Sequence, residues 1–487
     1  MRTWIPLAAI SLGAFMLLVD VSIVNVALPQ MSADLDSSFT ALQWVVDVYA
    51  LVLAALLMAL GSLGDRVGHR RLYLLGLVVF AAASLGCALA PGTGTLIAAR
   101  AAQGVGGAAM MTSTTALIGA AYRGRERGVA FGVWGAVNGA AAAVGPVLGG
   151  LLTDGFGWRS IFLVNVPVAA AAVLLTRATV PAQASRAGGG RFDLAGAALF
   201  TGFGAALVYG LIESGERGWD SPRVLVPLAG AALALAGFVL VERRAERPLL
   251  DLALLRNRGF LGLTLGGLLL TAGAFAQLTY TSLWLQQVLG LGPLGAGLVV
   301  CPLAASAFVV APLGARLFPQ AAPRRPVGYG LLLIGAGTLV LRLVGPGSGW
   351  AVLVPGLLVT GVGVGLATPS LMSGALAAVE PQRAGMAAGV VSTGRQLGFA
   401  LGIAVLGTVF QDRLRDFAGA VDPHVAFAAG LDRVYLVAGC AGLAAGVLVL
   451  ATVRPAAGAA AATSTAAVGA GGAGGVGTGG VGAGSAR

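Results

Sequence analysis

The sequence contains no lysine, so all 30 of its basic residues are arginines. A P-loop ATPase needs a phosphate-binding lysine and Schiff-base chemistry needs a lysine amine, so both are excluded from this chain. Charge is also scarce: 10% of the 487 residues are charged, against about 25% in soluble domains. The three cysteines lie in apolar runs, and the two histidines form no metal-ligand cluster. We therefore expect no disulfide, no metal and no cofactor.

Hydrophobic residues make up 57% of the chain and fall into runs long enough to cross a bilayer. The first run is too long for a signal peptide and lacks a small-residue cleavage site. The sequence predicts an all-α integral membrane protein with fourteen transmembrane spans: Trp4–Leu28, Thr40–Leu63, Leu72–Ala90, Gly94–Ala121, Val129–Leu152, Ile161–Leu175, Leu194–Leu211, Val224–Val241, Phe260–Leu283, Pro293–Leu313, Val327–Leu343, Ala351–Ala377, Ala387–Phe410 and Val434–Val453.

The arginines predict the orientation of these spans. With the N-terminus in the cytoplasm, 21 arginines fall on inner segments, seven fall outside and two, Arg100 and Arg395, lie within spans. This bias over short loops is a positive-inside signal, and it places both termini in the cytoplasm. Tryptophans near the predicted outer boundary agree with an aromatic belt: Trp44, Trp158, Trp219, Trp284 and Trp350. The arginines lie in short loops, which argues against a nucleic-acid partner.

An internal repeat relates the two ends of the chain at a constant offset of 257 residues. It pairs Gly104, Gly106 and Ser113 with their counterparts in the second part, and it pairs Gly128 and Gly145 likewise. Parallel six-helix repeats about an axis along the membrane normal are a transporter architecture. We expect a six-helix half at 1–176, a two-helix insert with cytoplasmic links at 177–258, a second six-helix half at 259–454, and a disordered Ala/Gly-rich cytoplasmic tail at 455–487.

The segment Gly128–Gly150 is rich in glycine and alanine and carries Pro146 near its far end. Such a helix is poor in water, but in lipid its small residues let neighbouring helices approach closely. The repeat retains Gly128 and Gly145 but replaces Pro146 by Ile403 and Asn138 by Arg395. This predicts a shared packing surface with a kink that belongs to one half alone.

Three charged residues are expected in one layer of the outer half of the membrane. Asp20 lies about 13 Å below the outer end of its span, and Asp47 and Arg100 lie about 10 Å below theirs, at 1.5 Å per residue. An intramembrane charge is costly, so these residues should be paired or line a wet space. Because two carboxylates face one guanidinium, one acid is left in excess.

Four motifs in this order resemble the major facilitator superfamily, and specifically its fourteen-span drug:proton antiporter family. Leu18 to Pro29 resembles the first-span motif, and Gly61-Ser-Leu-Gly-Asp65-Arg66-Val-Gly68-His-Arg70-Arg71 resembles the signature loop between spans two and three. Arg100-Ala-Ala-Gln103-Gly104-Val-Gly106 resembles the fourth-span proton-transfer motif. Gly139 to Gly145-Pro146-Val-Leu-Gly149-Gly150 resembles the span-five antiporter motif. The resemblance covers Trp4 to Arg454.

The resemblance implies a carrier, not an enzyme, that exports drug-like or antibiotic molecules across the bacterial cytoplasmic membrane in exchange for protons. The proton gradient then supplies the energy, no ATPase is needed, and a monomer suffices. We expect Asp20 to carry the proton, Arg100 to tune it, and Asp47 to assist or contact substrate. A purely structural Asp20–Arg100 pair is the alternative, and Trp44 and Tyr49 suggest that Asp47 lies near the interface.

For the signature loop, the resemblance implies a cytoplasmic latch that stabilises the outward-facing state. Asp65 is expected to pair with a nearby arginine or with a helix N-terminus. Arg70 and Arg71 have the alternative role of simple topological charges. Gln103, Asn138 and Arg395 are candidates for substrate contact or for the interface between the halves. For Arg395, binding of an anionic substrate, pairing across the halves and a structural role all remain open.

Other functions fit less well. Gly104-Val-Gly106-Gly107-Ala-Ala109 matches a dinucleotide fingerprint but lies inside an apolar span without a preceding strand. A facilitator of another specificity, such as a metabolite uptake carrier, is the main alternative. A membrane-embedded enzyme or sensor is a weaker one, because the sequence shows neither a soluble domain nor a catalytic constellation.

Overall fold

The structure, a computed structural model, describes residues 4–37, 39–181, 193–245, 248–317, 323–380, 383–416 and 422–453. Within these ranges every regular element is a helix. The predicted tail, 455–487, and much of the link after the sixth span lie outside them. The first group of helices is α1 (Ile5–Leu35), α2 (Phe39–Val67), α3 (His69–Ala88), α4 (Thr93–Ala121), α5 (Gly124–Phe156), α6 (Ser160–Leu163) and α7 (Asn165–Thr179).

A helical pair and a second group follow along the chain. The pair is α8 (Leu194–Arg217) and α9 (Pro222–Glu242), after which the short α10 (Leu252–Arg256) lies outside the bundle. The second group is α11 (Arg258–Ala274), α12 (Ala276–Leu283), the π-helix η1 (Trp284–Val288), α13 (Pro293–Leu317), α14 (Arg324–Val340), the 3-10 turns η2 (Leu341–Leu343) and η3 (Trp350–Val352), α15 (Leu353–Ala377), α16 (Ala384–Asp416) and α17 (Pro423–Thr452).

The predicted all-helical membrane fold is confirmed. Twelve helical segments in the described part of the chain are long and apolar enough to cross a membrane. The two remaining predicted spans, Gly94–Ala121 and Val129–Leu152, lie on α4 and α5, which have 29 and 33 residues. α4 is less apolar because it carries Arg100, Gln103 and a row of buried hydroxyl side chains. The count of fourteen crossings stays a prediction.

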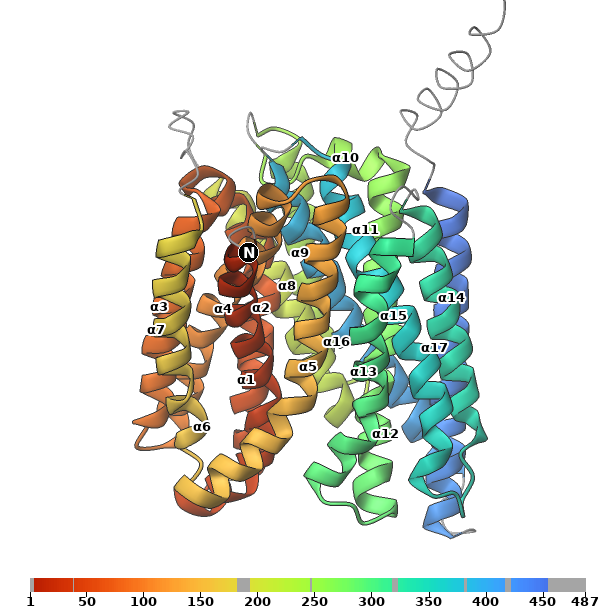
Figure 1. The fold of residues 1–487 in the computed structure, drawn as a ribbon. Coiled ribbons are helices and arrows are strands. Elements are labelled where there is room, and N and C mark those ends of the chain that lie inside the picture. The colour runs from red at the N-terminus through yellow and green to blue at the C-terminus, as the bar shows by residue number, and fades with distance from the viewer. Residues whose placement is uncertain are drawn as a thin grey trace, which may run out of the picture.

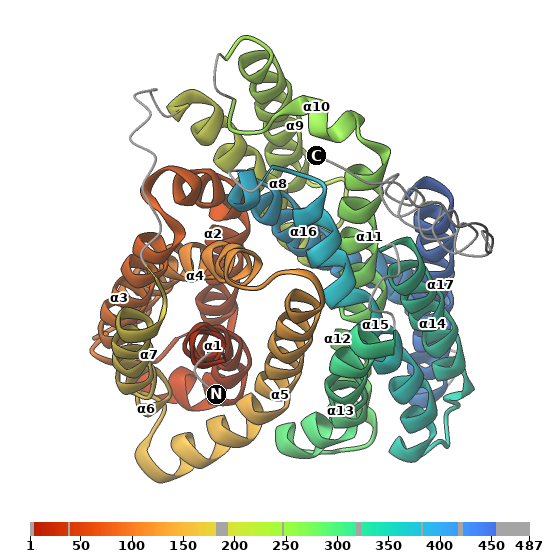
Figure 2. The same cartoon turned by 45° about the horizontal axis from the view of Figure 1, so that its top comes forward.

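The helices form two bundles that stand side by side, α1–α7 and α11–α17 (Figure 1). α8 lies beside α2 and α16, at one of the seams between the bundles, and α9 packs on α8 (Figure 2). α5 and α13 meet along the other seam. The division of the chain into two halves, an insert and a tail stays a prediction.

Close packing between the bundles involves glycines near the end that carries Asp65 and α10, called the Asp65 end below (the upper end in Figure 1). A Cβ added at Gly61 of α2 would lie 2.5 Å from the carbonyl oxygen of Gly385 of α16. A Cβ added at Gly132 of α5 would lie 3.0 Å from the carbonyl oxygen of Ala311 of α13. Small residues thus let both seams close at backbone distance.

The α8–α9 pair contacts both bundles. Trp44 of α2 stacks on Tyr209 of α8, with ring centroids 5.5 Å apart. Trp219, between α8 and α9, donates from Nε1 to Thr408 Oγ1 of α16 at 2.6 Å. Of the tryptophans predicted to form an aromatic belt, Trp158 and Trp284 are buried within the protein. Burial shows that these two pack inside the bundle and do not face lipid.

At the Asp65 end, the segment after α9 reaches α16. The buried carboxylate of Glu242 accepts hydrogen bonds from the backbone N–H groups of Leu249 and Leu250, at 3.1 and 3.3 Å. Asp251, the next residue, caps α10 and forms an ion pair with Arg383, which lies just before α16. The segment between α9 and α11 is thereby attached to the start of α16.

Candidate functional site

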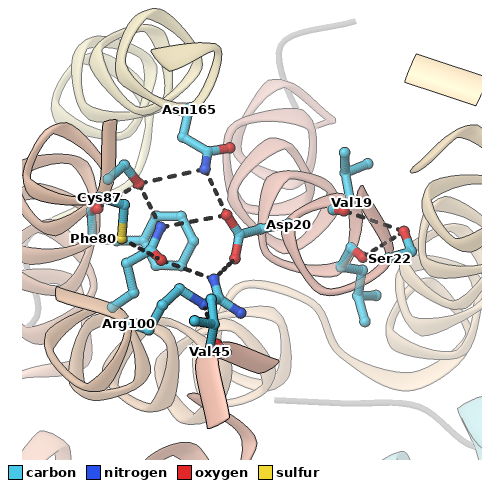
Figure 3. Close-up of polar contacts among 11 residues, drawn as sticks. Val19, Asp20, Ser22, Val45, Phe80, Cys87, Arg100 and Asn165 are labelled. Carbon is cyan, nitrogen blue, oxygen red and sulfur yellow. Dashed lines mark hydrogen bonds and ion pairs between the residues drawn. The ribbon is translucent and has the colours of Figure 1, made fainter. Parts of the chain in front are cut away.

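Asp20 and Arg100 form a fully buried ion pair between α1 and α4. Each residue is 0% exposed, and Arg100 Nη1 donates to Asp20 Oδ2 at 2.6 Å (Figure 3). Arg100 Nε also donates to the carbonyl oxygen of Val45 on α2, at 2.9 Å. Its guanidinium carbon lies 4.4 Å from the centroid of the Tyr49 ring, a distance at which the cation and the ring attract each other. The predicted pairing of Asp20 with Arg100 is therefore present in the structure.

Two amide side chains complete the shell around Asp20. Asn165 Nδ2 donates to Asp20 Oδ1 at 2.7 Å, and Gln103 Nε2 lies 3.3 Å from the same oxygen. Gln103 also donates to Ser84 Oγ at 2.7 Å and accepts from Arg100 Nη1 at 2.8 Å. Every described partner of the Asp20 carboxylate is thus a donor, as an ionised carboxylate requires.

Local breaks in the helices place these groups. α6 ends at Leu163 and α7 begins at Asn165, so the amide of Asn165 lies at the start of α7. Val45 and Tyr49 are four residues apart on α2 and therefore face Arg100 together. On α1, Asp20 and Ser22 lie on opposite sides, with Ser22 toward the next helix (Figure 3). α1 thus contacts Arg100 through Asp20 on one side and another helix through Ser22 on the opposite side.

That neighbour is α5, and the contact uses the predicted antiporter motif. A Cβ added at Gly145 would lie 2.8 Å from Ser22 Cβ, and one at Gly149 would lie 3.0 Å from Ile23 Cγ1. A Cβ added at Gly150 would have no neighbouring atom within 4 Å. For Gly139 and Pro146 the structure describes the helical backbone of α5 but not their side-chain surroundings. Gly145 and Gly149 let α5 pack directly on the segment of α1 that follows Asp20.

Asp47 lies on α2 and is partly exposed. It follows Val45 by two residues and precedes Tyr49 by two, so it is about 200° around the helix from the side that contacts Arg100. It shares a side of α2 with Trp44, which stacks on α8. The geometry places Asp47 at the same level as Asp20 and Arg100 but outside their cluster, and its role stays a prediction.

Asp65, the acid of the signature loop, contacts the opposite bundle. Its Oδ1 accepts from the N–H of Gly385 and its Oδ2 from the N–H of Met386, both at 2.8 Å. These amides belong to the first turn of α16, where the N–H groups have no partner inside the helix. His69 Nε2 lies 2.9 Å from Asp65 Oδ1. Of the two partners predicted for Asp65, the structure shows the helix N-terminus.

The other residues of the loop have distinct surroundings. Gly68 has φ 92°, in the left-handed region that favours glycine, and it ends the turn between α2 and α3. Gly61 packs against Gly385, as described above. Arg70 donates from Nη2 to the carbonyl oxygen of Arg177 at 2.8 Å, Arg66 is partly exposed and Arg71 is exposed. Within the signature loop, the side chain of Asp65 is thus one that bonds to α16. The role of the loop as a latch stays a prediction.

Two further candidates lie apart from the Asp20 cluster. Asn138, on α5, has a buried Oδ1 that finds no hydrogen-bond partner in the described part of the chain. Arg395, on α16, is partly exposed, and its backbone oxygen accepts from Thr271 Oγ1 of α11 at 2.6 Å. The structure therefore gathers Asp20, Arg100 and Gln103 in one cluster but leaves Asn138 and Arg395 outside it.

The sequence reasoning missed Asn165, Ser84, Tyr49 and His69. Asn165 and Ser84 are single polar residues in apolar runs, and that isolation is the signal that could have singled them out. From the sequence, Tyr49 indicates only a position near the interface, and His69 is one of two histidines without a metal cluster.

Comparisons with known proteins identify relatives of this chain. Residues 10–403 match the family model described as Major Facilitator Superfamily. The chain is 38% identical over 422 residues to the multidrug resistance protein Stp of Mycobacterium tuberculosis, covering 86% of this chain and 78% of that protein. It is 33% identical over 418 residues to the tetracenomycin C resistance and export protein of Streptomyces glaucescens, covering 85% and 77%. The crystal structure of the human organic anion transporter MFSD10 has the same fold, with a TM-score of 0.66, 17% identity and coverage of 92% and 99%.

Proposed function

The chain belongs to the major facilitator superfamily, and from this membership we propose that it is a proton-coupled antiporter that exports drug-like or antibiotic molecules. It is a transporter and not an enzyme, and it has relatives that are multidrug and antibiotic resistance proteins. Transporters of this superfamily typically work without a cofactor. The proposed location is the bacterial cytoplasmic membrane, with the Asp65 end and both termini in the cytoplasm and the monomer as the working unit.

The observation that carries the proposal is the buried Asp20–Arg100 pair. Asp20 is 0% exposed in the membrane part of α1 and holds three donors, one of them a cation. A proton that binds Asp20 cancels its charge and removes its attraction to Arg100. Arg100 keeps the carbonyl of Val45, the amide oxygen of Gln103 and the face of Tyr49, so it does not become an isolated charge. The site is therefore suited to bind and release a proton.

Protonation of Asp20 can also affect the contact between the two bundles, because α1 packs on α5. Ser22 and Ile23, just after Asp20, pack on Gly145 and Gly149 of α5. α5 in turn packs on α13 of the other bundle through Gly132 and Ala311. A shift of α1 on protonation is thus passed through α5 to the seam between the bundles. We assign the direction of transport to the Gly145-Pro146 pair, and a Pro146→Ala protein with full export and coupling would reduce that pair to a packing role.

The Asp65 latch supports alternating access. It joins α2 to the start of α16 and, with the glycine contacts of both seams, holds the two bundles together at the Asp65 end. With that end in the cytoplasm, this closure supports an outward-facing state. Opening toward the cytoplasm requires Asp65 to release Gly385 and Met386.

A susceptibility panel in an efflux-deficient bacterial host tests the function. We expect expression of the protein to raise tolerance to some drugs or antibiotics, and a proton uncoupler to abolish drug efflux in the same cells. Asp20→Asn should remove the tolerance, while Asp432→Asn, which breaks an exposed ion pair with Arg342, should retain it. Tolerance that is equal with Asp20→Asn at equal protein levels would reject the assignment of Asp20.

A further inference from the structure

Arg395 is a charged side chain within the membrane-spanning helix α16, and no described residue supplies a counter-charge to it. It lies about 16 Å from the start of α16, at 1.5 Å per residue. Its guanidinium forms no hydrogen bond or ion pair with any of the described residues, and no charged group among them acts on it. An unpaired intramembrane arginine is costly and marks a functional position by default.

The described acids of the bundle that holds Arg395 do not pair with it. Asp412, Asp416 and Asp432 lie on α16 and α17 but are paired with Arg415, Arg413 and Arg342. From Phe260 to Gln411 the chain contains a single carboxylate, Glu380, which follows the end of α15. In the other bundle, the Asp20 carboxylate is bound to Arg100. The counter-charge of Arg395 is therefore not supplied by a described residue, and a ligand can supply it.

The surroundings of Arg395 suit a ligand rather than a structural contact. Its Cγ lies over Gly267 of α11, 3.3 Å from the position of an added Cβ, so the absence of a side chain at Gly267 leaves room for the arginine. Leu371 of α15 borders the same position, at 3.5 Å. Ser392, one turn earlier on α16, is 0% exposed, and its hydroxyl has no partner among the described residues. A cation and a free hydroxyl thus lie on neighbouring turns of one helix.

The repeat adds an independent observation. The offset of 257 residues places Asn138 of α5 at the position equivalent to Arg395 of α16. Asn138 Oδ1 is also buried and without a partner in the described part of the chain. Substrate sites of such carriers lie near the middle of the membrane at the interface of the repeats. Two equivalent positions, one in each bundle, therefore carry unused polar groups at this depth.

We propose that Arg395 is the cationic subsite of the transport pathway and binds an anionic oxygen of the exported molecule, a carboxylate or a phenolate. A guanidinium holds such a group through two parallel hydrogen bonds, and an apolar neighbour such as Leu371 contacts the body of the molecule. This inference rests on the proposed function of small-molecule export and specifies its substrate class as organic acids. Asn138, with its free amide oxygen, then accepts from a hydroxyl or N–H group of the same molecule.

Equilibrium binding of two dyes to purified full-length protein in lipid nanodiscs tests the inference. Fluorescein and rhodamine 123 share a xanthene skeleton, but the first is an anion at mildly alkaline pH and the second a cation. We expect the wild-type protein to bind fluorescein more tightly. Arg395→Gln should weaken fluorescein binding about 10- to 100-fold, the effect of losing a charged hydrogen-bond partner, and should not weaken rhodamine 123 binding. Arg395→Lys should retain part of the affinity.

Arg342→Gln is the matched control, because Arg342 lies in an exposed ion pair with Asp432. Equal fluorescein affinity of the wild type and folded Arg395→Gln would overturn the proposal. If Arg395→Gln does not fold, the wild type alone decides, because fluorescein bound no more tightly than rhodamine 123 also overturns it. No proton gradient is present in this assay. Export that does not depend on the proton gradient would reject antiport but not the proposed role of Arg395. Fluorescein binding that does not depend on Arg395, together with proton-coupled export, would reject the role of Arg395 alone.

Discussion

Replacing Asp20 by asparagine retains the shape of the side chain and removes its charge. All three described partners of Asp20 are donors, so the amide nitrogen introduced by Asp20→Asn faces another donor. Removing one partner of a buried ion pair typically costs about 3–5 kcal/mol, because the other charge remains buried. Arg100 keeps the carbonyl of Val45, the oxygen of Gln103 and the ring of Tyr49. These contacts offset part of the loss, so we expect Asp20→Asn to lower the free energy of unfolding by about 2–4 kcal/mol.

A double variant separates this structural effect from proton coupling. Asp20→Asn combined with Arg100→Gln removes both charges and leaves a neutral network of amides, so its stability should return to within about 1–2 kcal/mol of the wild type. Proton-driven uptake of a drug into inside-out vesicles should be absent from the single and from the double variant. A double variant that is as stable as the wild type and still transports in response to a pH gradient would refute the role of Asp20.

Three further substitutions test the contacts between the bundles. Asp65→Asn weakens the hold on amides in the first turn of α16 by about 1 kcal/mol, the typical value of a helix cap, so cysteine labelling should show the cytoplasmic side open about fivefold more often. Gly145→Ala forces a methyl group against α1 and should lower the free energy of unfolding by about 1–3 kcal/mol and slow export. Asp251→Asn breaks a partly exposed pair with Arg383, so it should change stability by about 0–1 kcal/mol but shift the labelling in the same direction as Asp65→Asn.

Each of these has a matched control in the chain. Asp412→Asn breaks an exposed pair with Arg415 at the opposite end of α16 and should leave the labelling unchanged. Gly150→Ala adds a methyl group where nothing lies within 4 Å and should be tolerated. Unchanged cysteine labelling in Asp65→Asn would refute the proposed role of Asp65 as a latch. Equal stability of Gly145→Ala and Gly150→Ala would show that α5 moves away from α1 without cost.

The positions of helices follow from the sequence because each apolar run is bounded by polar residues, loops or glycines. The breaks inside helices do not follow from the sequence. The sixth predicted span is divided into α6 and α7 at Val164, and the span from Phe260 is divided after Ala274. Asn165 and Pro167 stand at the first division, and Gly273 and Gln277 flank the second. Such residues do not mark a break by themselves, because Pro227 lies inside the continuous helix α9. Such breaks depend on how neighbouring helices pack, and a short stretch of sequence carries no information about those distant contacts.

The candidate site shows the same limit. The sequence predicts that Asp20 and Arg100 lie in one layer because their depths below the ends of their spans are similar, and depth follows from residue counts. The sequence does not predict the roles of Asn165 and Ser84, because a neutral polar residue in an apolar run does not reveal which neighbour it faces. Asp65 bonds to amides 320 and 321 residues further along the chain. The sequence predicted the kind of partner but not which helix supplies it.

Proton release on substrate binding tests the central claim most directly. A drug identified by the susceptibility panel is added to purified protein in weakly buffered detergent solution, and a pH-sensitive dye reports released protons. We predict that the wild type and Asp432→Asn release protons on drug addition, while Asp20→Asn binds the drug and releases none. Release of equal size from Asp20→Asn, or drug binding by the wild type without any release, would contradict exchange of drug for protons at Asp20.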